Sequence, residues 1–502
     1  MEGRYTAVDS IPGLVAGLRK TWKSGKTLNL EWRLQQLRQL IKLLKENENQ
    51  IIAALKADLR STDLIAGSEV DSSIKEATAA IKNLPEWSKP EEKSVPLMHK
   101  PGSGFIVKEP YGLVLIISPW NYPISLLLKP LVGAISAGNV ACLKPSEVSV
   151  NCSRVLFDLI PRYLDQEAVV VVEGAVEETQ ALLKEAWDYI FYTGNGKVGR
   201  EVMKAASANL TPVTLELGGK SPVILDSHVN LDVAARRLCW AKFTVNAGQT
   251  CVAPDYILVT KDMEKPLLEK MAATLKEFYG NNPKATADYS RIINERHTQR
   301  VAALIEGHDV FVGGEVDVED RYIAPTILTN VDTNAKVMQE EIFGPVLPIV
   351  PVDSVEQAID FINDRPKPLA LYIFSNSSAT QDKVLKNTFS GGVAINDAIL
   401  QVVCPELPFG GVGESGMGAY NGKHTFDTFT HRKSVLKRAV WSDPSLRYPP
   451  YTESKLKWLK LLGGDLKIPR WVVIALLAVP VIAFVFSRYG FLFNNASSSG
   501  RL

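Results

Sequence analysis

Residues 34–59 carry apolar side chains at spacings of three and four, with polar residues between them. This spacing places the apolar positions on one face of a helix. The pattern therefore predicts an amphipathic helical region early in the chain.

From Tyr111 onward, short runs rich in β-branched residues alternate with helical stretches. Each run ends in a polar or glycine-rich turn, as in the βαβ units of a doubly wound parallel sheet. Such a sheet binds ligands at the carboxyl ends of its strands. The predicted strands are 112–118, 139–144, 168–174, 188–194 and 212–219, with helices at 123–137 and 198–208 among them.

A second α/β series follows Gly219. Its predicted strands are 221–226, 256–260, 369–375 and 391–397, and its predicted helices are 230–247 and 263–279. Residues 89–104 are rich in Pro, Gly and Ser, which predicts an excursion out of the first series.

Near its C-terminus the chain has sixteen residues without a charge, 471–486. Extension to 493 gives a helix long enough to span a membrane. A buried core helix is the alternative, although apolarity on every face favours lipid. Basic residues precede this stretch, which predicts a tail anchor with the preceding chain on the cytosolic side; they are Lys455, Lys457, Lys460, Lys467 and Arg470. We expect the endoplasmic reticulum, with the peroxisome and the mitochondrial outer membrane as alternatives.

Charge and cysteine content exclude several classes of protein. The 502 residues contain 56 Lys and Arg against 55 Asp and Glu, so no broad basic surface for nucleic acid is expected. The five cysteines are scattered without a CxxC pair, which argues against a disulfide framework and a structural zinc site. We expect no bound metal.

Four strand-end segments present groups that can do chemistry. They carry Asn121, Glu216, Cys251 and the pair Glu340 and Glu341. Each is a weak signal alone, but together they supply a nucleophile, an amide donor and two candidate bases. A turn also supplies backbone N–H groups that favour a thiolate at Cys251.

The segment TGNGKVG at 193–199 enters a predicted helix with Gly194 and Gly199. Its spacing matches neither the GxGxxG fingerprint nor a complete P-loop. By itself it is equally consistent with a phosphate site and with an ordinary helix N-terminal turn.

The motifs LELGGK (215–220), GQTC (248–251), EEIFGP (340–345) and PFGGVGESGMG (408–418) together resemble the aldehyde dehydrogenase superfamily, and the resemblance extends to about Arg432. KPSE (144–147) and FYTGN (191–195) are similar to its class 3 branch, and the apolar tail to that branch's membrane-anchored fatty aldehyde dehydrogenases. The resemblance implies an α/β fold with a modified Rossmann cofactor domain, an α/β catalytic domain, a small β bridging or oligomerisation element and a C-terminal transmembrane helix.

On this basis the expected domains run in order along the chain. They are an NAD(P)-binding domain at 1–217 interrupted by a bridging hairpin near 89–110, a catalytic domain at 218–400, a bridging and oligomerisation segment at 401–445, an amphipathic linker helix at 446–470 and the anchor at 471–493. The linker helix is expected to lie at the membrane surface, with a solvated linker as the alternative.

The resemblance also implies roles for individual residues. Cys251 attacks the aldehyde, Asn121 and the Cys251 N–H hold the oxyanion, and Glu216, or second Glu341, activates the water that cleaves the thioester. NAD is the expected cofactor, with NADP as the alternative, and its expected contacts are Lys144, Glu147, Gly194, Asn195, Gly199, Glu341 and Phe343.

The expected function is NAD(P)-dependent oxidation of medium- or long-chain fatty aldehydes to carboxylic acids by a homodimer. Two alternatives are a cysteine hydrolase, which would need a histidine base, and a catalytically silent membrane scaffold. The intact set of Asn121, Glu216, Cys251 and Glu341 argues against the scaffold.

Overall fold

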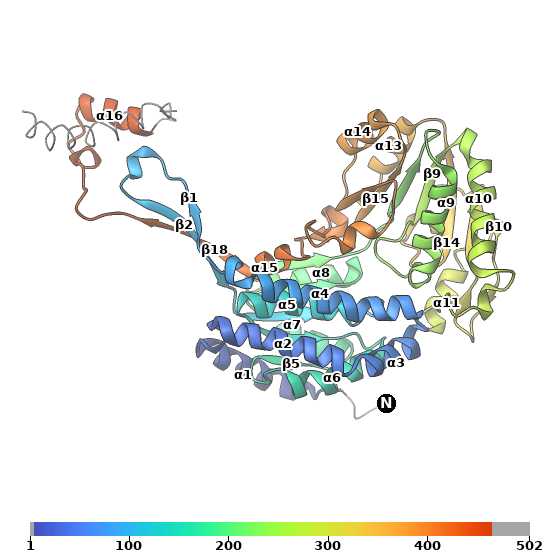
Figure 1. Cartoon of the computed structure of the whole chain (residues 1–502), viewed down its shortest axis with the longest axis horizontal. Helices are drawn as coiled ribbons and strands as arrows, with labels where there is room; N and C mark the ends of the chain where they lie inside the picture. The colour runs from blue at the N-terminus through green and yellow to red at the C-terminus, as the bar shows by residue number, and fades with distance from the viewer. Residues whose placement is uncertain (1–4, 464–502) are drawn as a thin grey trace, which may run out of the picture. The chain divides into compact units, whose positions relative to one another are not determined.

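The computed structural model describes residues 5–463. The chain divides into two compact units, which are treated separately below. The first unit contains the described residues up to 89 and residues 108–431, and the second contains residues 90–107 and the described residues from 432 onward. Figure 1 labels the elements along the chain.

The first unit begins with four helices, of which α2 and α3 cover the predicted helical region. The region is two helices because Asn47 interrupts it with non-helical backbone angles and donates its side-chain amide to Leu43 O (2.8 Å). Their apolar faces are fully buried at Leu37, Leu40 and Leu55. The bounds are α1 Ile11–Lys23, α2 Leu30–Glu46, α3 Glu48–Leu59 and α4 Asp63–Trp87.

A six-stranded sheet with the order β17-β7-β6-β3-β4-β5 forms the first α/β layer. Its five predicted strands are confirmed and run parallel, while β17 pairs antiparallel with β7. The strands are β3 Leu113–Ile117, β4 Val140–Lys144, β5 Val169–Val171, β6 Tyr189–Thr193, β7 Val213–Glu216 and β17 Gly416–Met417. The helices are α5 Ser125–Ala137, α6 Val150–Tyr163, α7 Val176–Lys184, α8 Gly196–Ser207 and α15 Lys423–Thr428.

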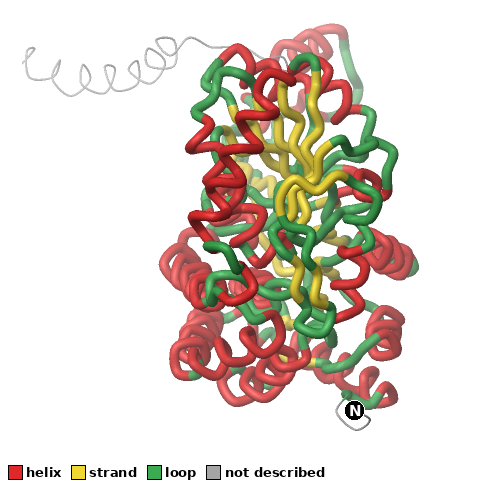
Figure 2. Tube along the Cα trace, turned by 90° about the vertical axis from the view of Figure 1, so that its right-hand side faces the viewer, coloured by secondary structure: helices red, strands yellow, loops and turns green. Residues whose placement is uncertain are grey.

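A seven-stranded sheet with the order β10-β13-β14-β9-β8-β15-β16 forms the second layer, and Figure 2 shows its strands in yellow with helices on both sides. The four predicted strands are confirmed as β8 Pro222–Leu225, β9 Tyr256–Thr260, β15 Ala370–Phe374 and β16 Gly392–Ile395. The other strands are β10 Asp309–Val312, β13 Thr326–Thr329 and β14 Val346–Val352, with a separate hairpin of β11 Val316–Asp317 and β12 Tyr322–Ile323. The helices are α9 Leu231–Cys239, α10 Lys261–Tyr279, α11 Glu295–Ala302, α12 Lys336–Gln339, α13 Val355–Asn363 and α14 Ser378–Asn387.

The prediction of one helix over 230–247 is wrong in its second half. The α-helix ends at Cys239, a π-helical turn spans Trp240–Thr244, and a short 3₁₀ turn spans Asn246–Gly248. Asn246 and Ala247 have φ angles of 51° and 48°, which an α-helix cannot contain. This irregular stretch leads directly into Cys251.

The second unit is a three-stranded sheet with the order β1-β2-β18, followed by a helix. Its elements are β1 Glu91–Lys93, β2 Ser103–Pro110, β18 Thr430–Lys437 and α16 Glu453–Gly463. Within the expected bridging segment 401–445, β17 and α15 lie in the first unit. The bridging role of the second unit stays a prediction.

The predicted membrane anchor at 471–493 lies outside the described residues. Within residues 5–463, no helix has both the length and the apolar character needed to cross a membrane.

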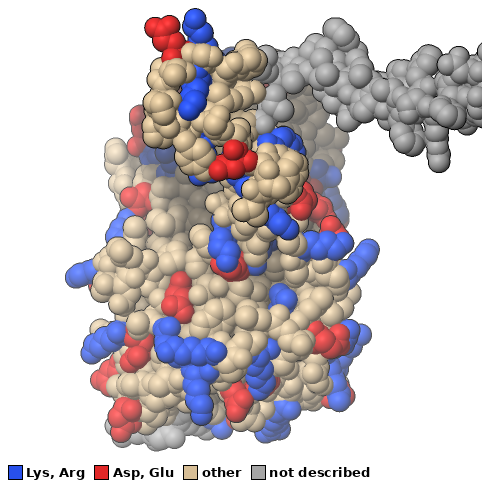
Figure 3. Space-filling model, turned by 90° about the vertical axis from the view of Figure 1, so that its left-hand side faces the viewer, with Lys and Arg blue, Asp and Glu red and all other residues tan. Residues whose placement is uncertain are grey.

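Figure 3 shows acidic and basic side chains interspersed on the face that it views.

Candidate active site

Cys251 follows a strained turn in the first unit. Asn246, Ala247 and Gly248 all have positive φ angles, the last of 74°. A Cβ atom at Gly248 would also collide with the carbonyl oxygen of Gly344. Glycine is therefore required where this loop packs against the segment that follows Phe343.

Gln249 anchors the loop and was missed by the sequence analysis. It is fully buried, and its Nε2 donates to Asn246 O (3.1 Å) and Arg291 O (2.9 Å). Its Oε1 accepts from the N–H of Ile293 (2.9 Å). Asn121 Nδ2 donates to Gln249 O (2.9 Å), so the predicted oxyanion donor is tied to the loop that carries the nucleophile.

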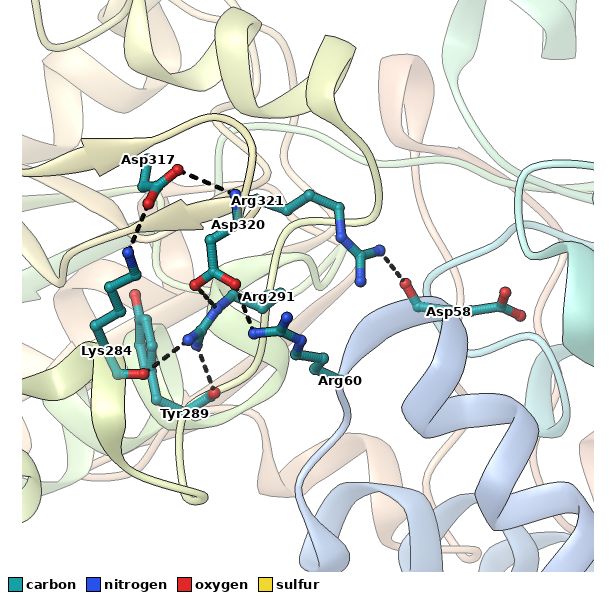
Figure 4. Close-up of polar contacts among 8 residues, drawn as sticks. All are labelled: Asp58, Arg60, Lys284, Tyr289, Arg291, Asp317, Asp320 and Arg321. Atoms are coloured by element: carbon teal, nitrogen blue, oxygen red, sulfur yellow. Dashed lines mark hydrogen bonds and ion pairs between the residues drawn. The ribbon is translucent and has the colours of Figure 1, made fainter.

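Arg291 belongs to a polar cluster that joins α3 to the β11–β12 hairpin, drawn in Figure 4. Its Nε lies 3.0 Å from Asp320 Oδ2, and Arg60 Nη1 lies 2.7 Å from the other carboxylate oxygen. Arg321 donates to Asp58 O (2.6 Å). This cluster supports the nucleophile loop through the Gln249 side chain, while Asn121 bonds the Gln249 backbone.

Two cavities adjoin Cys251. The first has a volume of about 640 Å³ and the second about 800 Å³. Among the residues that the structure describes, only Leu126 and Cys251 line both cavities. The thiol therefore stands where the two cavities meet, which is the position that a nucleophile needs between a cofactor and a substrate.

The first cavity collects nearly all the predicted site residues, although they are far apart in sequence. Its lining includes Asn121, Lys144, Glu147, Gly194, Asn195, Glu216, Cys251, Glu341 and Phe343. Gly199 does not line it. A Cβ at Gly199 would lie 2.8 Å from Leu217 Cδ2, so this glycine lets α8 pack closely on the sheet.

Lys144 and Glu147 are two neighbouring residues in the lining of the first cavity. Lys144 is buried at the end of β4, where its Nζ donates to Pro145 O (2.7 Å) and lies 3.4 Å from Glu147 Oε2. Burial lowers the pKa of this lysine. Asn195 caps α8, because its Oδ1 accepts from the N–H of Val198 (3.0 Å).

These residues fit a dinucleotide. A cavity of this volume is typical of a cofactor site. The N-terminus of α8 favours an anion, and Glu147 supplies an acceptor for ribose hydroxyls. Gly218 lets the backbone approach Glu341 closely in this cavity, since a Cβ atom at Gly218 would collide with the Glu341 carboxylate. The backbone N–H of Gly219 also donates to Glu341.

The net shift in the pKa of Cys251 is opposite to the expectation from its turn. The backbone N–H groups of Cys251 and Val252 favour the thiolate, as predicted. Burial outweighs them, and with the Glu341 and Glu216 carboxylates it raises the pKa of Cys251 to about 12. The thiol therefore needs a base to take its proton.

Of the two candidate bases, Glu216 is buried and Glu341 is partly buried. Burial raises the pKa of Glu216 well above its usual value, and neither of its oxygens has a hydrogen-bond partner among the described residues. Burial and Asp255 raise the pKa of Glu341 to about 8. With its pKa near 8, Glu341 can both accept and release a proton at working pH.

Lys220, in the LELGGK motif, holds the Glu341 segment. Its Nζ donates to Val337 O (2.7 Å) and Glu340 O (3.0 Å) and pairs with Asp255. Asp255 Oδ1 in turn accepts from the N–H of Ile342 (3.0 Å). The sequence signal that could have pointed to Lys220 is the LELGGK motif, in which this lysine directly follows the paired glycines.

An aromatic wall lies beside the nucleophile in the first cavity. Trp120 packs against Phe343 with ring centroids 5.3 Å apart and against His297 at 5.2 Å. Burial, with Arg300 and Arg296, lowers the pKa of His297 to about 4, so this imidazole is neutral at physiological pH.

The chain matches known proteins over most of its length. A family model described as "Aldehyde dehydrogenase family" matches residues 11–435. The chain is 51% identical over 449 residues to aldehyde dehydrogenase family 3 member A2 of Rattus norvegicus, covering 89% of this chain and 93% of that protein. It is 50% identical over 446 residues to the Rattus norvegicus protein named "Aldehyde dehydrogenase, dimeric NADP-preferring", covering 88% of this chain and 98% of that one.

Solved structures agree with this. A structure of the substrate-bound state of Staphylococcus aureus AldH matches with a TM-score of 0.88 and 44% identity, covering 90% of this chain and 99% of that one. An aldehyde dehydrogenase of Mycobacterium tuberculosis complexed with NAD+ matches with a TM-score of 0.78 and 27% identity, covering 88% and 92%. The chain therefore belongs to the aldehyde dehydrogenase family, in its class 3 branch, and is an oxidoreductase that oxidises aldehydes with NAD(P) as its cofactor.

Proposed function

We propose that this enzyme oxidises medium- and long-chain fatty aldehydes to carboxylic acids at the sulfur of Cys251. The observation that carries the proposal is the junction of two cavities at this thiol. The second cavity holds the substrate, and its apolar lining includes Ile65, Trp240, Val245, Ile399 and Val402. A hydrocarbon chain gains about 0.8 kcal/mol for each methylene that it buries on such surfaces.

The first step is attack of the sulfur on the aldehyde carbon. Because burial keeps the thiol protonated, a nearby carboxylate takes its proton as the carbon–sulfur bond forms. Negative charge then develops on the aldehyde oxygen. The Asn121 amide and the backbone N–H of Cys251 hold that oxygen, and loss of one such donor costs about 10²–10³ in turnover.

Lys144, Glu147 and Asn195 would hold NAD(P) in the first cavity, and the bound cofactor would supply the acceptor for a hydride from the substrate carbon. The protein's part is to hold the reacting groups in place and to exclude water. Phe343 and Trp120 form an apolar wall, and Glu341 is fixed by the N–H of Gly219. Glu147 favours a ribose with a free 2′-hydroxyl, which supports NAD over NADP.

Release of the acid requires hydrolysis of the thioester on Cys251. We propose Glu216 as the base that takes a proton from the attacking water. The support is that its carboxyl lines the first cavity and makes no hydrogen bond to any described residue, so both oxygens are free to accept. Glu341 is the alternative, supported by its pKa of about 8.

We also propose that residues 471–493 anchor the enzyme in a membrane, with the endoplasmic reticulum as the expected location. This is supported by the charge-free run at 471–486. In α16, the side chains of Leu456, Trp458 and Leu461 are about half exposed among lysines, as in an interfacial helix. A homodimer is supported by the relative whose name calls it dimeric.

One assay tests the proposal. Purified protein is mixed with NAD and a long-chain aldehyde, and NADH is followed by its absorbance. We expect NADH from the wild type and none from Cys251→Ala. A hydrolase would instead cleave an activated ester while producing no NADH from any aldehyde, and a scaffold would do neither; either result contradicts the proposal.

A further inference from the structure

Tyr372 is a fully buried residue in the middle of β15. Its side chain belongs to the same apolar core as Val252, and Cys251 packs against that core. The flanking residues Leu371 and Ile373 belong to a different core, because alternate residues of a strand point to opposite faces of the sheet. A phenylalanine would fill this position without a polar atom. The buried hydroxyl of a tyrosine needs hydrogen-bond partners, so the partners of Tyr372 show what it holds together.

The Tyr372 hydroxyl joins two segments that are distant in sequence. Its O–H donates to the carbonyl oxygen of Val252 (2.5 Å). Its oxygen accepts from the N–H of Ile399 (3.3 Å) and from Gln401 Nε2 (3.3 Å). A hydroxyl has one donor position and two acceptor positions, so all the positions of this one are used. A single atom therefore ties the loop that carries Cys251 to the segment at 399–401.

On the side of the nucleophile, Tyr372 holds the residue that directly follows Cys251. No other described residue donates to the carbonyl oxygen of Val252. The backbone N–H groups of Cys251 and Val252 favour the thiolate, and their direction depends on the backbone angles of this loop. Asn121 and Gln249 hold the loop before the sulfur. Tyr372 holds it after the sulfur.

On the side of the substrate, Tyr372 holds a strained residue. Ile399 lines the second cavity together with Cys251 and has a φ angle of 69°. This is an unfavourable conformation for a β-branched residue, and it persists only where the surroundings fix it. The Ile399 N–H that Tyr372 accepts is one such contact. The same hydroxyl therefore fixes the cavity wall and the sulfur relative to each other.

We propose that Tyr372 is a positioning residue for aldehyde oxidation, whose hydroxyl fixes the loop that carries Cys251 against the Ile399 segment of the second cavity. Tyr372 acts through these two segments, since it is absent from the lining of both cavities. Burial raises the pKa of Tyr372, so the hydroxyl keeps its proton at working pH and can donate it to Val252 O. The inference rests on the proposed role of Cys251 as the nucleophile.

Two variants of the full chain weaken this tie, and a third is a matched control. Tyr372→Phe removes only the hydroxyl. Gln401→Glu replaces a donor to the hydroxyl by an acceptor, which competes with Val252 O for the O–H, and position 401 is only partly buried. The control Tyr189→Phe removes another buried hydroxyl, which bonds Thr214 Oγ1 (2.6 Å) from the start of β6.

For each protein we measure kcat and the KM for NAD with nonanal as substrate. We also measure the rate at which iodoacetamide alkylates Cys251, with the modified peptide identified by mass spectrometry. Thermal unfolding shows which variants fold. The alkylation rate and the comparison of kcat with the KM for NAD report on the position of the sulfur. A loss of stability elsewhere in the core would leave both unchanged.

Tyr372→Phe and Gln401→Glu should lower kcat by about tenfold to a hundredfold, because a misplacement of about 1 Å has an effect of that size. Both should slow alkylation of Cys251, and the KM for NAD should change by less than about twofold because Tyr372 contacts no residue expected to bind the cofactor. Tyr189→Phe should keep kcat and the alkylation rate.

The inference is overturned if folded Tyr372→Phe keeps the kcat and the alkylation rate of the wild type, or if Tyr189→Phe loses as much. Should Tyr372→Phe fail to fold, Gln401→Glu decides, and an unchanged kcat in that variant overturns the inference. Absence of NADH from the wild type with nonanal would instead contradict the proposed oxidation itself.

Discussion

Glu341 lines the first cavity together with Cys251 and has a pKa of about 8. A carboxyl acts as a base only when ionised, so activity that depends on Glu341 must rise as pH increases through about 8. We predict this rise in kcat/KM of the wild type. Glu341→Gln should remove it and lower turnover by about 10²–10⁴. A pH–rate profile from pH 6 to 10 checks this; an unaltered rise in the variant would assign the titration to another group.

Glu69 predicts a pH dependence of stability. Its pKa is about 8 in the folded protein against 4.5 in the reference state, so the folded state binds the extra proton. The free energy of unfolding therefore falls as pH rises from about 4.5 to 8, by at most about 1.4 kcal/mol per pH unit from this group. The Glu69→Gln variant should lack this fall in the free energy of unfolding. The control variant Glu177→Gln, at an exposed position, should keep it. Urea unfolding at pH 5, 6.5 and 8 measures the difference; parallel curves for all three proteins would contradict it.

The sequence could predict which residues gather at the candidate site but not their protonation. Asn121 follows β3, Glu216 ends β7 and Cys251 follows the irregular turn after α9, each within a recognisable motif, and the structure brings them to one cavity. The raised pKa of Cys251 depends on burial and on two carboxylates from distant segments, which no local pattern reveals.

At the level of elements, we expect the position of the nucleophile loop to depend on the polar cluster around Arg291 and Asp320 in Figure 4, called the Asp320 cluster below. Arg291 is 5% exposed and pairs with Asp320, whose side chain is 21% exposed. Asp320→Asn leaves the Arg291 charge poorly compensated and should lower the free energy of unfolding by about 1–3 kcal/mol. Asp353→Asn, which breaks the exposed pair with Lys261, should cost no more than about 1 kcal/mol.

Chemical denaturation of the two variants supplies the comparison. Equal losses of stability would show that the Asp320 cluster is no more than a surface ion pair. We also measure kcat at saturating cofactor and substrate. A lower kcat in Asp320→Asn would show that the cluster positions the nucleophile loop through Gln249, as the hydrogen bond from Gln249 to Arg291 O implies.

Element types were more predictable than their irregularities. Strand runs such as 112–118 and 256–260 are β-branched and apolar on both faces, as buried parallel strands require. The break at Asn47 and the π-helical turn at Trp240–Thr244 were not predicted. At Asn47 the break goes with non-helical backbone angles and a local bond to Leu43 O, and after the π-helical turn the positive φ angles of Asn246 and Ala247 prevent the helix from continuing.

For the whole molecule, the proposed anchor predicts membrane binding. The full chain should float with phospholipid vesicles in a density gradient, and a chain truncated after residue 463 should bind more weakly or not at all. A chain truncated after residue 444 removes α16 as well, and its ratio of kcat/KM for long- over short-chain aldehydes tests the interfacial role of that helix. Equal flotation of the full and truncated chains would contradict the anchor.

The most direct test of the central claim is acid quenching of the enzyme during turnover with NAD and nonanal, followed by peptide mass spectrometry. We predict an added acyl group on the peptide that contains Cys251, accumulating in Glu216→Gln because hydrolysis of the thioester is slowed. NADH production without any acyl group on Cys251, or an acyl group on Cys404 instead, would contradict the account.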